Sequence, residues 1–299
     1  MNAAPAVRSP KFFLIDKEFV RCGLCPNNCE IKSGYFGACG VRGNKGGKGI
    51  IPFYGFITAL AVDPIEKKPL YRYKPGSKIL SLGFAGCNLR CPFCQNWHIS
   101  QNTDSKGRWM KPEEVISTAL KQDLSIAYTY SEPLVHIEYI LDCMALARKH
   151  GITNVLVTNG CINAEPAAEI LALTDAANID LKSFSADTYR ILNGVHNKKP
   201  DILQTVLEFI KLGCKMGIHI EITTLVVPGL NDSEEELNSI ADFIFSLTET
   251  DKTNPGIPWH LTAYHPDYRW NAPPTDPDFL RKIAKKAREK LQFVYTGNI

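Results

Sequence analysis

The chain has 299 residues, of which 44% are hydrophobic and 22% are charged, and its formal net charge is only +3. A chain of this length and composition can bury a sizeable core, and so small a basic excess favours neither nucleic acid nor an anionic membrane as a partner. No apolar run approaches the roughly 18 residues of a transmembrane helix, and the N-terminus lacks the apolar segment of a secretion signal.

Residues 1–77 carry the first of two cysteine groups. Ten cysteines in a chain without a secretion signal indicate metal ligands rather than disulfides, and a cytoplasmic location. Four thiolates saturate a tetrahedral zinc ion, and such a site can stabilise a segment too small for a large core. We therefore predict a small Cys-rich, metal-binding module, with an auxiliary [4Fe-4S] cluster as the alternative to zinc. Its ligands would be Cys22, Cys25, Cys29 and Cys39, at the spacing C-x2-C-x3-C-x9-C.

Residues 78–299 alternate between strand-like and helix-like segments. The expected strands are mostly continuous apolar runs, which is typical of parallel strands covered on both faces. Six or seven β-α units fall short of the eight of a closed barrel, so we predict an α/β fold, a partial (β/α)6-type TIM barrel. The strands are expected within 78–86, 125–133, 153–160, 176–183, 215–229, 257–266 and 292–298, and the helices within 112–122, 136–151, 164–174, 186–194, 201–213, 233–247 and 276–292.

The second cysteine group directly follows the first of these strands. Cys87, Cys91 and Cys94 have the spacing C-x3-C-x2-C, and loops at the carboxyl ends of barrel strands build active sites. Thiolates suit both zinc and iron-sulfur clusters. Zinc would need a fourth ligand, for which His98 is close enough in the sequence, whereas a [4Fe-4S] cluster on three thiolates keeps one iron open for another ligand.

The cysteine motif, with Phe93 just before its third cysteine, resembles that of the radical S-adenosylmethionine (SAM) superfamily. The resemblance implies an enzyme whose open iron is chelated by the amino and carboxylate groups of SAM. An electron from the cluster then cleaves SAM to a 5′-deoxyadenosyl radical, which takes a hydrogen atom from a substrate. It further implies a [4Fe-4S] cluster and SAM as cofactors and a flavodoxin- or ferredoxin-type electron donor. The catalytic and cluster-binding residues would be Cys87, Cys91 and Cys94.

Polar residues near the ends of the later strands extend the resemblance. YTYSEP (128–133) lies where the superfamily has its Gly-Gly-Glu-type segment, and Glu132 matches the acid. DLK (180–182) resembles the Asp-x-Lys of glycyl-radical-enzyme activases. A zwitterionic ligand needs both an acid and a base, so we expect Glu132 to accept from the amino group of SAM and Lys182 to pair with its carboxylate. The other candidate cofactor-binding residues are Tyr130, Thr158, Asn159, Asp180 and His265.

Each of these candidates also has a structural alternative. Asp180 and Lys182 lie on the same side of a strand, where a simple ion pair is common. Asn159 precedes a glycine and fits a turn, Tyr130 fits core packing, and His265 fits a hydrogen-bonded structural histidine.

The full set of motifs, with CGLCPNNC…GACGVRGN near the N-terminus and VYTGN at the end, is similar to one subgroup of the superfamily. This subgroup is the radical enzyme of the AmmeMemoRadiSam system, related to pyruvate formate-lyase activating enzymes. AMMECR-type and Memo-type proteins of the same gene neighbourhoods are the partners it implies, and the substrate stays unidentified. The rival hypotheses are an activase that places a glycyl radical on a partner protein and a non-catalytic zinc-binding adaptor.

Overall fold

The computed structural model describes residues 10–15, 19–104, 106–194, 201–249 and 256–299. An eight-stranded sheet forms its centre, running from β15 (Val294–Gly297) at one edge to β7 (Ala59–Pro64) at the other. Between them, from the β15 side, lie β14 (Trp259–Ala263), β13 (His219–Val226), β12 (Ala176–Asp180), β11 (Asn154–Thr158), β10 (Ser125–Thr129) and β8 (Lys78–Gly83).

The strand order of this sheet follows the order of the chain. All pairs from β8 to β15 are parallel, whereas β7 runs antiparallel to β8. Each crossover therefore moves one strand further in the same direction, as in a barrel wall, whereas a doubly wound sheet reverses at its centre. The predicted α/β partial barrel is confirmed, and the last predicted strand joins it as β15. Most residues of β8 to β14 are buried, which explains their continuous apolar sequences.

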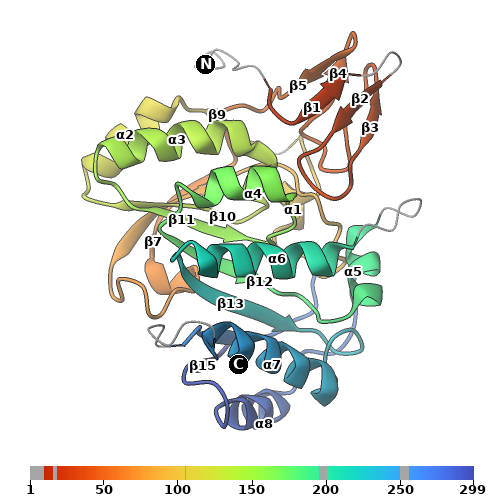
Figure 1. Ribbon diagram of the computed structural model, residues 1–299, viewed down its shortest axis with the longest axis vertical. Helices are drawn as coiled ribbons and strands as arrows, with labels where there is room; N and C mark the ends of the chain where they lie inside the picture. The colour runs from red at the N-terminus through yellow and green to blue at the C-terminus, as the bar shows by residue number, and fades with distance from the viewer. Residues whose placement is uncertain (1–9, 16–18, 105, 195–200, 250–255) are drawn as a thin grey trace.

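Successive helices lie side by side on the outer face of the sheet (Figure 1). α5 shows how local sequence sets their ends: the Ser185 side chain accepts from Thr188 N at its start, and Gly194 ends it with a φ of 63°. No helix within the described ranges has the length and apolar character of a membrane span. The helices are α2 (Pro112–Leu120), α3 (Ile137–Lys149), α4 (Ala164–Leu171), α5 (Ala186–Asn193), α6 (Ile202–Lys215), α7 (Glu234–Glu249) and α8 (Pro277–Ala287).

The last helix is shorter than the sequence predicts. The pattern predicted helix within 276–292, but α8 ends at Ala287. The chain then turns back toward the sheet, and the Arg288 guanidinium donates to the carbonyl oxygen of Val294 at 2.8 Å. Tertiary contact with β15 thus overrides a continuous helical pattern.

The N-terminal residues form small antiparallel sheets above one end of the barrel wall (Figure 1). β7 lies within residues 1–77 yet pairs along its whole length with β8, so it belongs to the barrel sheet. The division of the chain at residue 77 stays a prediction. The small sheets are β1 (Phe13–Ile15), β2 (Phe19–Cys22) and β3 (Glu30–Lys32), then β4 (Gly43–Lys45) with β5 (Lys48–Ile50), and β6 (Phe56–Ile57) with β9 (Arg108–Trp109).

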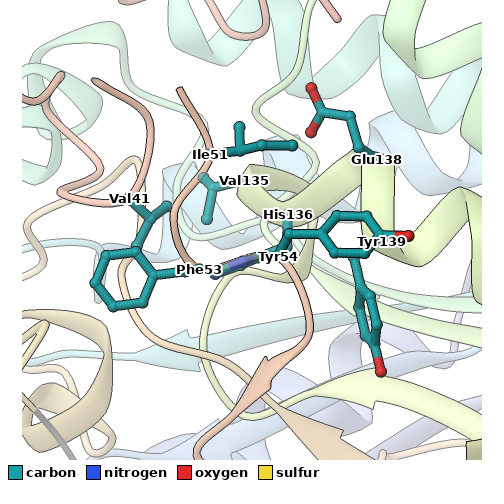
Figure 2. A pocket seen from close by; sticks show the side chains of 8 residues that line it. All are labelled: Val41, Ile51, Phe53, Tyr54, Val135, His136, Glu138 and Tyr139. Carbon is teal, nitrogen blue, oxygen red and sulfur yellow. The ribbon is translucent and has the colours of Figure 1, made fainter. Parts of the chain in front are cut away.

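The N-terminal segment packs against α3 and the 3-10 helix η2 (Pro133–His136) that precedes it. A small cavity marks this contact, with residues of both segments around it (Figure 2). At its rim, Arg42 forms an ion pair with Glu138 of α3 at 2.7 Å, and their side chains are only 1% and 2% exposed. The residues that line the cavity are Val41, Ile51, Phe53 and Tyr54 from the N-terminal segment, and Val135, His136, Glu138 and Tyr139 from η2 and α3.

A buried carboxylate fixes the segment before β8 to the amino edge of the sheet. Glu221 of β13 accepts from the backbone N–H groups of Tyr71 at 2.9 Å and Arg72 at 2.7 Å. The same carboxylate also contacts two imidazoles. His219 Nε2 lies 3.0 Å from Oε1, and His260 Nε2 lies 2.6 Å from Oε2. Burial favours the neutral acid, but these four partners lower the pKa of Glu221 to about 2.

Candidate active site

The loop after β8 carries the cysteines of the second group. It passes through Gly86, whose φ is 81° and whose Cβ, if present, would lie 2.5 Å from the carbonyl oxygen of Cys39. Both facts require glycine, because other residues rarely adopt this conformation and would collide with backbone. The loop ends in the short helix α1 (Trp97–Ser100). It lies at the carboxyl edge of the parallel strands, where barrel enzymes build their active sites. Its three thiols are Cys87, Cys91 and Cys94.

The surroundings of Cys87 and Cys91 favour the protonated thiol. Burial raises the pKa of Cys91 to about 12, although the nearby Lys182 lowers it in part. Burial, and next the charge of Glu132, raise the pKa of Cys87 well above its ordinary value. Such thiols lose their protons when a metal takes the proton's place. The same electrostatic effects show that Glu132 and Lys182 lie within reach of the cysteine loop.

The donor set fits an iron-sulfur cluster. A [4Fe-4S] cluster binds each thiolate through a different iron, so its ligands surround it and need not meet at a point. His98, the fourth ligand of the zinc alternative, is exposed and lines a pocket beside the loop.

Glu132 joins the ends of β10 and β11. Its carboxylate accepts from Leu134 N at 3.0 Å, from Thr158 Oγ1 at 2.7 Å and from Asn159 N at 2.8 Å. The side chain is only 2% exposed, and burial raises its pKa to about 7 against these three donors. Thr158 and Asn159 therefore lie next to Glu132, as the predicted site requires. Binding of the amino group of SAM by this carboxylate stays a prediction.

Asn159 links the end of β11 to the cysteine loop. Its Nδ2 donates to Asn88 Oδ1 at 2.9 Å and lies 3.8 Å from Cys87 Sγ. Asn88 Nδ2 in turn donates to the carbonyl oxygen of Cys161 at 2.6 Å. On the other side of the loop, Asn27 Nδ2 donates to the carbonyl oxygen of Asn88 at 3.0 Å. This amide chain holds the residue after the first cysteine from two directions.

Asp180 and Lys182 stand together at the end of β12. Lys182 Nζ lies 2.9 Å from Asp180 Oδ2, and the two side chains are 18% and 35% exposed. Burial opposes the charge of Lys182, but Asp180 and then Cys91 raise its pKa above the ordinary value. Lys182 is thus a cation beside the cysteine loop, and the ion pair named as its structural alternative is present as well.

A pocket of about 460 Å³ opens next to the cysteine loop. Tyr130 forms one wall of it and has a φ of 69°, a strained value for a residue with a side chain. The strain is offset by the contacts of its side chain, because the hydroxyl donates to Asp63 and Lys68 Nζ lies 4.8 Å from the ring centre. The other lining residues are Thr58, Ala59, Asn96, His98, Ile99 and Lys106.

His265 lies apart from the other predicted site residues. It is exposed, and its Nε2 lies 2.8 Å from the carbonyl oxygen of Asn298. The residues after it do reach the cysteine loop: Tyr268 stacks on Trp97 with ring centres 5.2 Å apart, and Arg269 N donates to Pro92 O at 2.8 Å. A part in the site stays a prediction for His265.

Sequence reasoning missed three buried polar residues that lie within the cysteine motifs. Asn27, Asn88 and Arg42 are almost fully buried, yet each stands alone in the sequence without a periodic pattern. A buried amide or guanidinium must find partners, but its partner is set by packing between distant segments. Only the position of Asn88, directly after Cys87, hinted at a role.

The chain belongs to the radical SAM superfamily, whose family model matches residues 82–244. An uncharacterized protein of Methanocaldococcus jannaschii is 39% identical over 290 residues, which cover 95% of this chain and 83% of that protein. The pyruvate formate-lyase-activating enzyme of Clostridium pasteurianum is 25% identical over 219 residues, or 70% of this chain and 86% of that enzyme. These relations support an enzyme, and the superfamily implies a [4Fe-4S] cluster and SAM as cofactors.

Solved structures share the fold of this chain. Streptococcus suis SuiB bound to the precursor peptide SuiA matches with a TM-score of 0.55 at 15% identity, covering 79% of this chain and 51% of that one. SuiB bound to S-adenosylmethionine matches with a TM-score of 0.53 at 17% identity, over 74% and 51% of the two chains. At such identities the likeness concerns the fold alone.

Proposed function

We propose that this protein cleaves SAM reductively at a [4Fe-4S] cluster bound by Cys87, Cys91 and Cys94, and abstracts a hydrogen atom from a substrate. The observation that carries the proposal is the position of the three thiols in the loop after β8, where Asn159 joins Glu132 to Cys87: its N–H donates to Glu132 at 2.8 Å and its Nδ2 lies 3.8 Å from Cys87 Sγ. A cluster bound by these cysteines would supply the electron for cleavage of SAM. The protein's own task is to bind and orient SAM and the substrate and to exclude water from them.

The polar residues around the loop divide this task between them. Lys182, held by Asp180, offers a charge for the carboxylate of SAM. Glu132 keeps an accepting position beside its three protein donors for the amino group. Asn159 orients Asn88 next to Cys87. The pocket walled by Tyr130 lies beside the loop and is where we place the substrate.

Conversion of SAM to 5′-deoxyadenosine tests this proposal. Anaerobically reconstituted and reduced protein should release 5′-deoxyadenosine slowly even without substrate. The triple variant Cys87→Ala/Cys91→Ala/Cys94→Ala should release none. Cys214→Ala, which removes a partly buried thiol of α6, is the matched control and should keep the activity. Release by the triple variant at the wild-type rate would refute the assignment.

We further propose that the enzyme is the radical SAM member of the AmmeMemoRadiSam system and acts in the cytoplasm. The support is the motif string shared with that subgroup, from CGLCPNNC to VYTGN. Its partners would be AMMECR-type and Memo-type proteins and a flavodoxin- or ferredoxin-type donor. Transfer of deuterium from a labelled lysate into 5′-deoxyadenosine should increase when these partners are added. Equal transfer with and without them would count against the assignment.

A glycyl-radical activase is the second candidate, because the 25% identity to an activating enzyme extends over 70% of this chain. Such an activity would leave a glycyl radical on a partner protein, visible as a doublet in its EPR spectrum. The doublet would decide for the activase, whereas deuterium from a small molecule in 5′-deoxyadenosine would decide against it. The superfamily match favours either enzyme over the zinc-binding adaptor.

A further inference from the structure

The four N-terminal cysteines surround one small enclosed cavity. Cys22 ends β2, the next two lie in the connection to β3, and Cys39 precedes β4. The cavity between them is about 10 Å³, which is room for a single atom of about the size of a water molecule. None of the four is in a disulfide. The cavity is lined by Cys22, Leu24, Cys25, Asn27, Cys29, Ile31, Gly37, Ala38, Cys39, Arg42 and Val135.

Each of these sulfur atoms accepts an N–H group. Arg42 Nε donates to Cys22 Sγ and Ala38 N to Cys29 Sγ, both at 3.4 Å. The backbone N–H of Asn27 donates to Cys25, and those of Val41 and Arg42 donate to Cys39. A thiol is a weak acceptor, whereas a thiolate attracts N–H groups strongly. Metal-bound thiolates in proteins commonly accept N–H groups in the same way as these four sulfur atoms.

The side chain of Asn27 also lines this cavity and is 3% exposed.

We infer that Cys22, Cys25, Cys29 and Cys39 bind one zinc ion, and that this ion holds Asn27 against the cysteine loop of the active site. The size of the cavity favours one ion over an eight-atom cluster. The four sulfur atoms do not converge on one point at bonding distance. Rotation of the cysteine side chains must bring each sulfur to roughly 2.3 Å from the zinc ion. A set of four thiolates leaves no open position, so the ion is structural.

The path from this ion to the active site is short. Asn27 lies between the second and third zinc ligands, and its Nδ2 holds the carbonyl oxygen of Asn88. Asn88 is the residue next to Cys87 and the partner of Asn159. Asn163, after β11, fixes the same turn through Gly23 O at 2.8 Å and Leu24 O at 3.0 Å. Loss of the ion should therefore loosen one side of the cysteine loop.

The zinc site is tested without the catalytic cluster. In Cys87→Ala/Cys91→Ala/Cys94→Ala, full-length protein should still contain about one zinc per chain. Cobalt added in place of zinc should give the absorption of a tetrahedral cobalt–thiolate site. Adding Cys25→Ser should abolish both signals, whereas adding Cys214→Ser should change neither. Absence of zinc from the triple variant, or about four irons in it after reconstitution, would overturn the inference, whether or not the proposed SAM chemistry is correct.

The positioning role of Asn27 rests on the proposed function and has a test of its own. Asn27→Ala in the otherwise native chain should keep zinc and iron, yet weaken SAM binding about fivefold, the effect of one lost hydrogen bond. Lys32→Ala, a change at an exposed side chain of the nearby β3, is the control and should bind SAM normally. Unchanged SAM affinity in Asn27→Ala would refute the positioning role and leave the zinc site standing.

Discussion

The cysteines near the N-terminus and those after β8 differ in what surrounds their sulfur atoms. The N-terminal four enclose a cavity of about 10 Å³ and receive N–H donors from their own segment. The three after β8 stand at the carboxyl edge of the sheet, where Glu132 is close to Cys87 and Lys182 is close to Cys91. The first arrangement suits a saturated ion, and the second leaves charged groups for a further ligand. Spacing identifies thiol ligands, whereas the neighbours indicate whether a site is closed or reactive.

The largest effect we predict separates the two groups by a single substitution. Cys91→Ala should remove the iron-sulfur cluster and all SAM cleavage, because two thiolates no longer hold a cluster that three are needed to bind. Iron content and the visible absorption of reconstituted protein measure this. Zinc content should stay at the wild-type level. Retention of about four irons per chain would show that Cys91 is not a ligand and would break the comparison.

A second prediction concerns the ion pair that joins the N-terminal group to the barrel. Arg42→Met should lower the free energy of unfolding by about 3–5 kcal/mol, because it leaves Glu138 buried without a counter-charge. Chemical denaturation measures the change. The double variant Arg42→Met/Glu138→Leu should regain most of the loss, since no buried charge is then left unpaired.

Zinc binding distinguishes the two roles of Arg42. The double variant still lacks the bond from Arg42 Nε to Cys22 Sγ, so it should release zinc to a chelator faster than the wild type even where stability is restored. Equal release rates would mean that Arg42 serves the fold alone. Equal stability of Arg42→Met and the wild type would contradict the ion-pair argument itself.

The third prediction uses Glu221, at the amino edge of the sheet, as a reference for the two cysteine groups. Glu221 has a pKa lowered to about 2, so its ionised form contributes about 3 kcal/mol of stability at neutral pH. Because the folded pKa lies below the unfolded one, this contribution is complete above about pH 4.5 and is lost as the pH falls through about 2. Glu221→Gln should therefore be less stable at pH 7, and its deficit should shrink on acidification.

Metal content makes this variant a control for the two cysteine groups. Glu221 bonds to Tyr71 and Arg72 at the amino edge, away from both groups. Zinc and iron per chain should match the wild type in Glu221→Gln. If the stability deficit of Glu221→Gln does not change with pH, Glu221 stabilises the fold through its packing rather than through its charge.

The parts of the fold predicted from sequence were those with a repeating pattern. Continuous apolar runs identified the parallel strands from β8 to β15. β7 was assigned to the N-terminal segment because short strands near glycines give no sign of their partner. The pairing of β7 with β8 depends on tertiary packing, which one segment's pattern does not contain.

The site shows the same division. The strand ends brought Glu132, Thr158 and Asn159 together because parallel strands deliver their carboxyl ends to one edge. His265 follows β14 and bonds to Asn298 after the parallel strand β15, so it lies at the carboxyl edge but on the side of the sheet away from β10 and β11. Asn27 and Asn88 meet across 61 residues of sequence, a contact that no local spacing announces.

The last prediction concerns Lys182, where a cofactor-binding and a structural role give different results. Lys182→Ala should weaken SAM binding ten- to a hundredfold, because it removes a charge-assisted bond worth roughly 1.5–3 kcal/mol. Equilibrium dialysis of the reconstituted protein measures the affinity. Lys211→Ala is the matched control, since that lysine pairs with Glu208 on the exposed side of α6.

Asp180→Asn tests the partner of the lysine. If Asp180 only orients Lys182, its loss should weaken SAM binding less than loss of Lys182 does. Unchanged affinity in Lys182→Ala, with reduced stability, would make the pair structural and leave the cysteine loop to bind SAM through other residues.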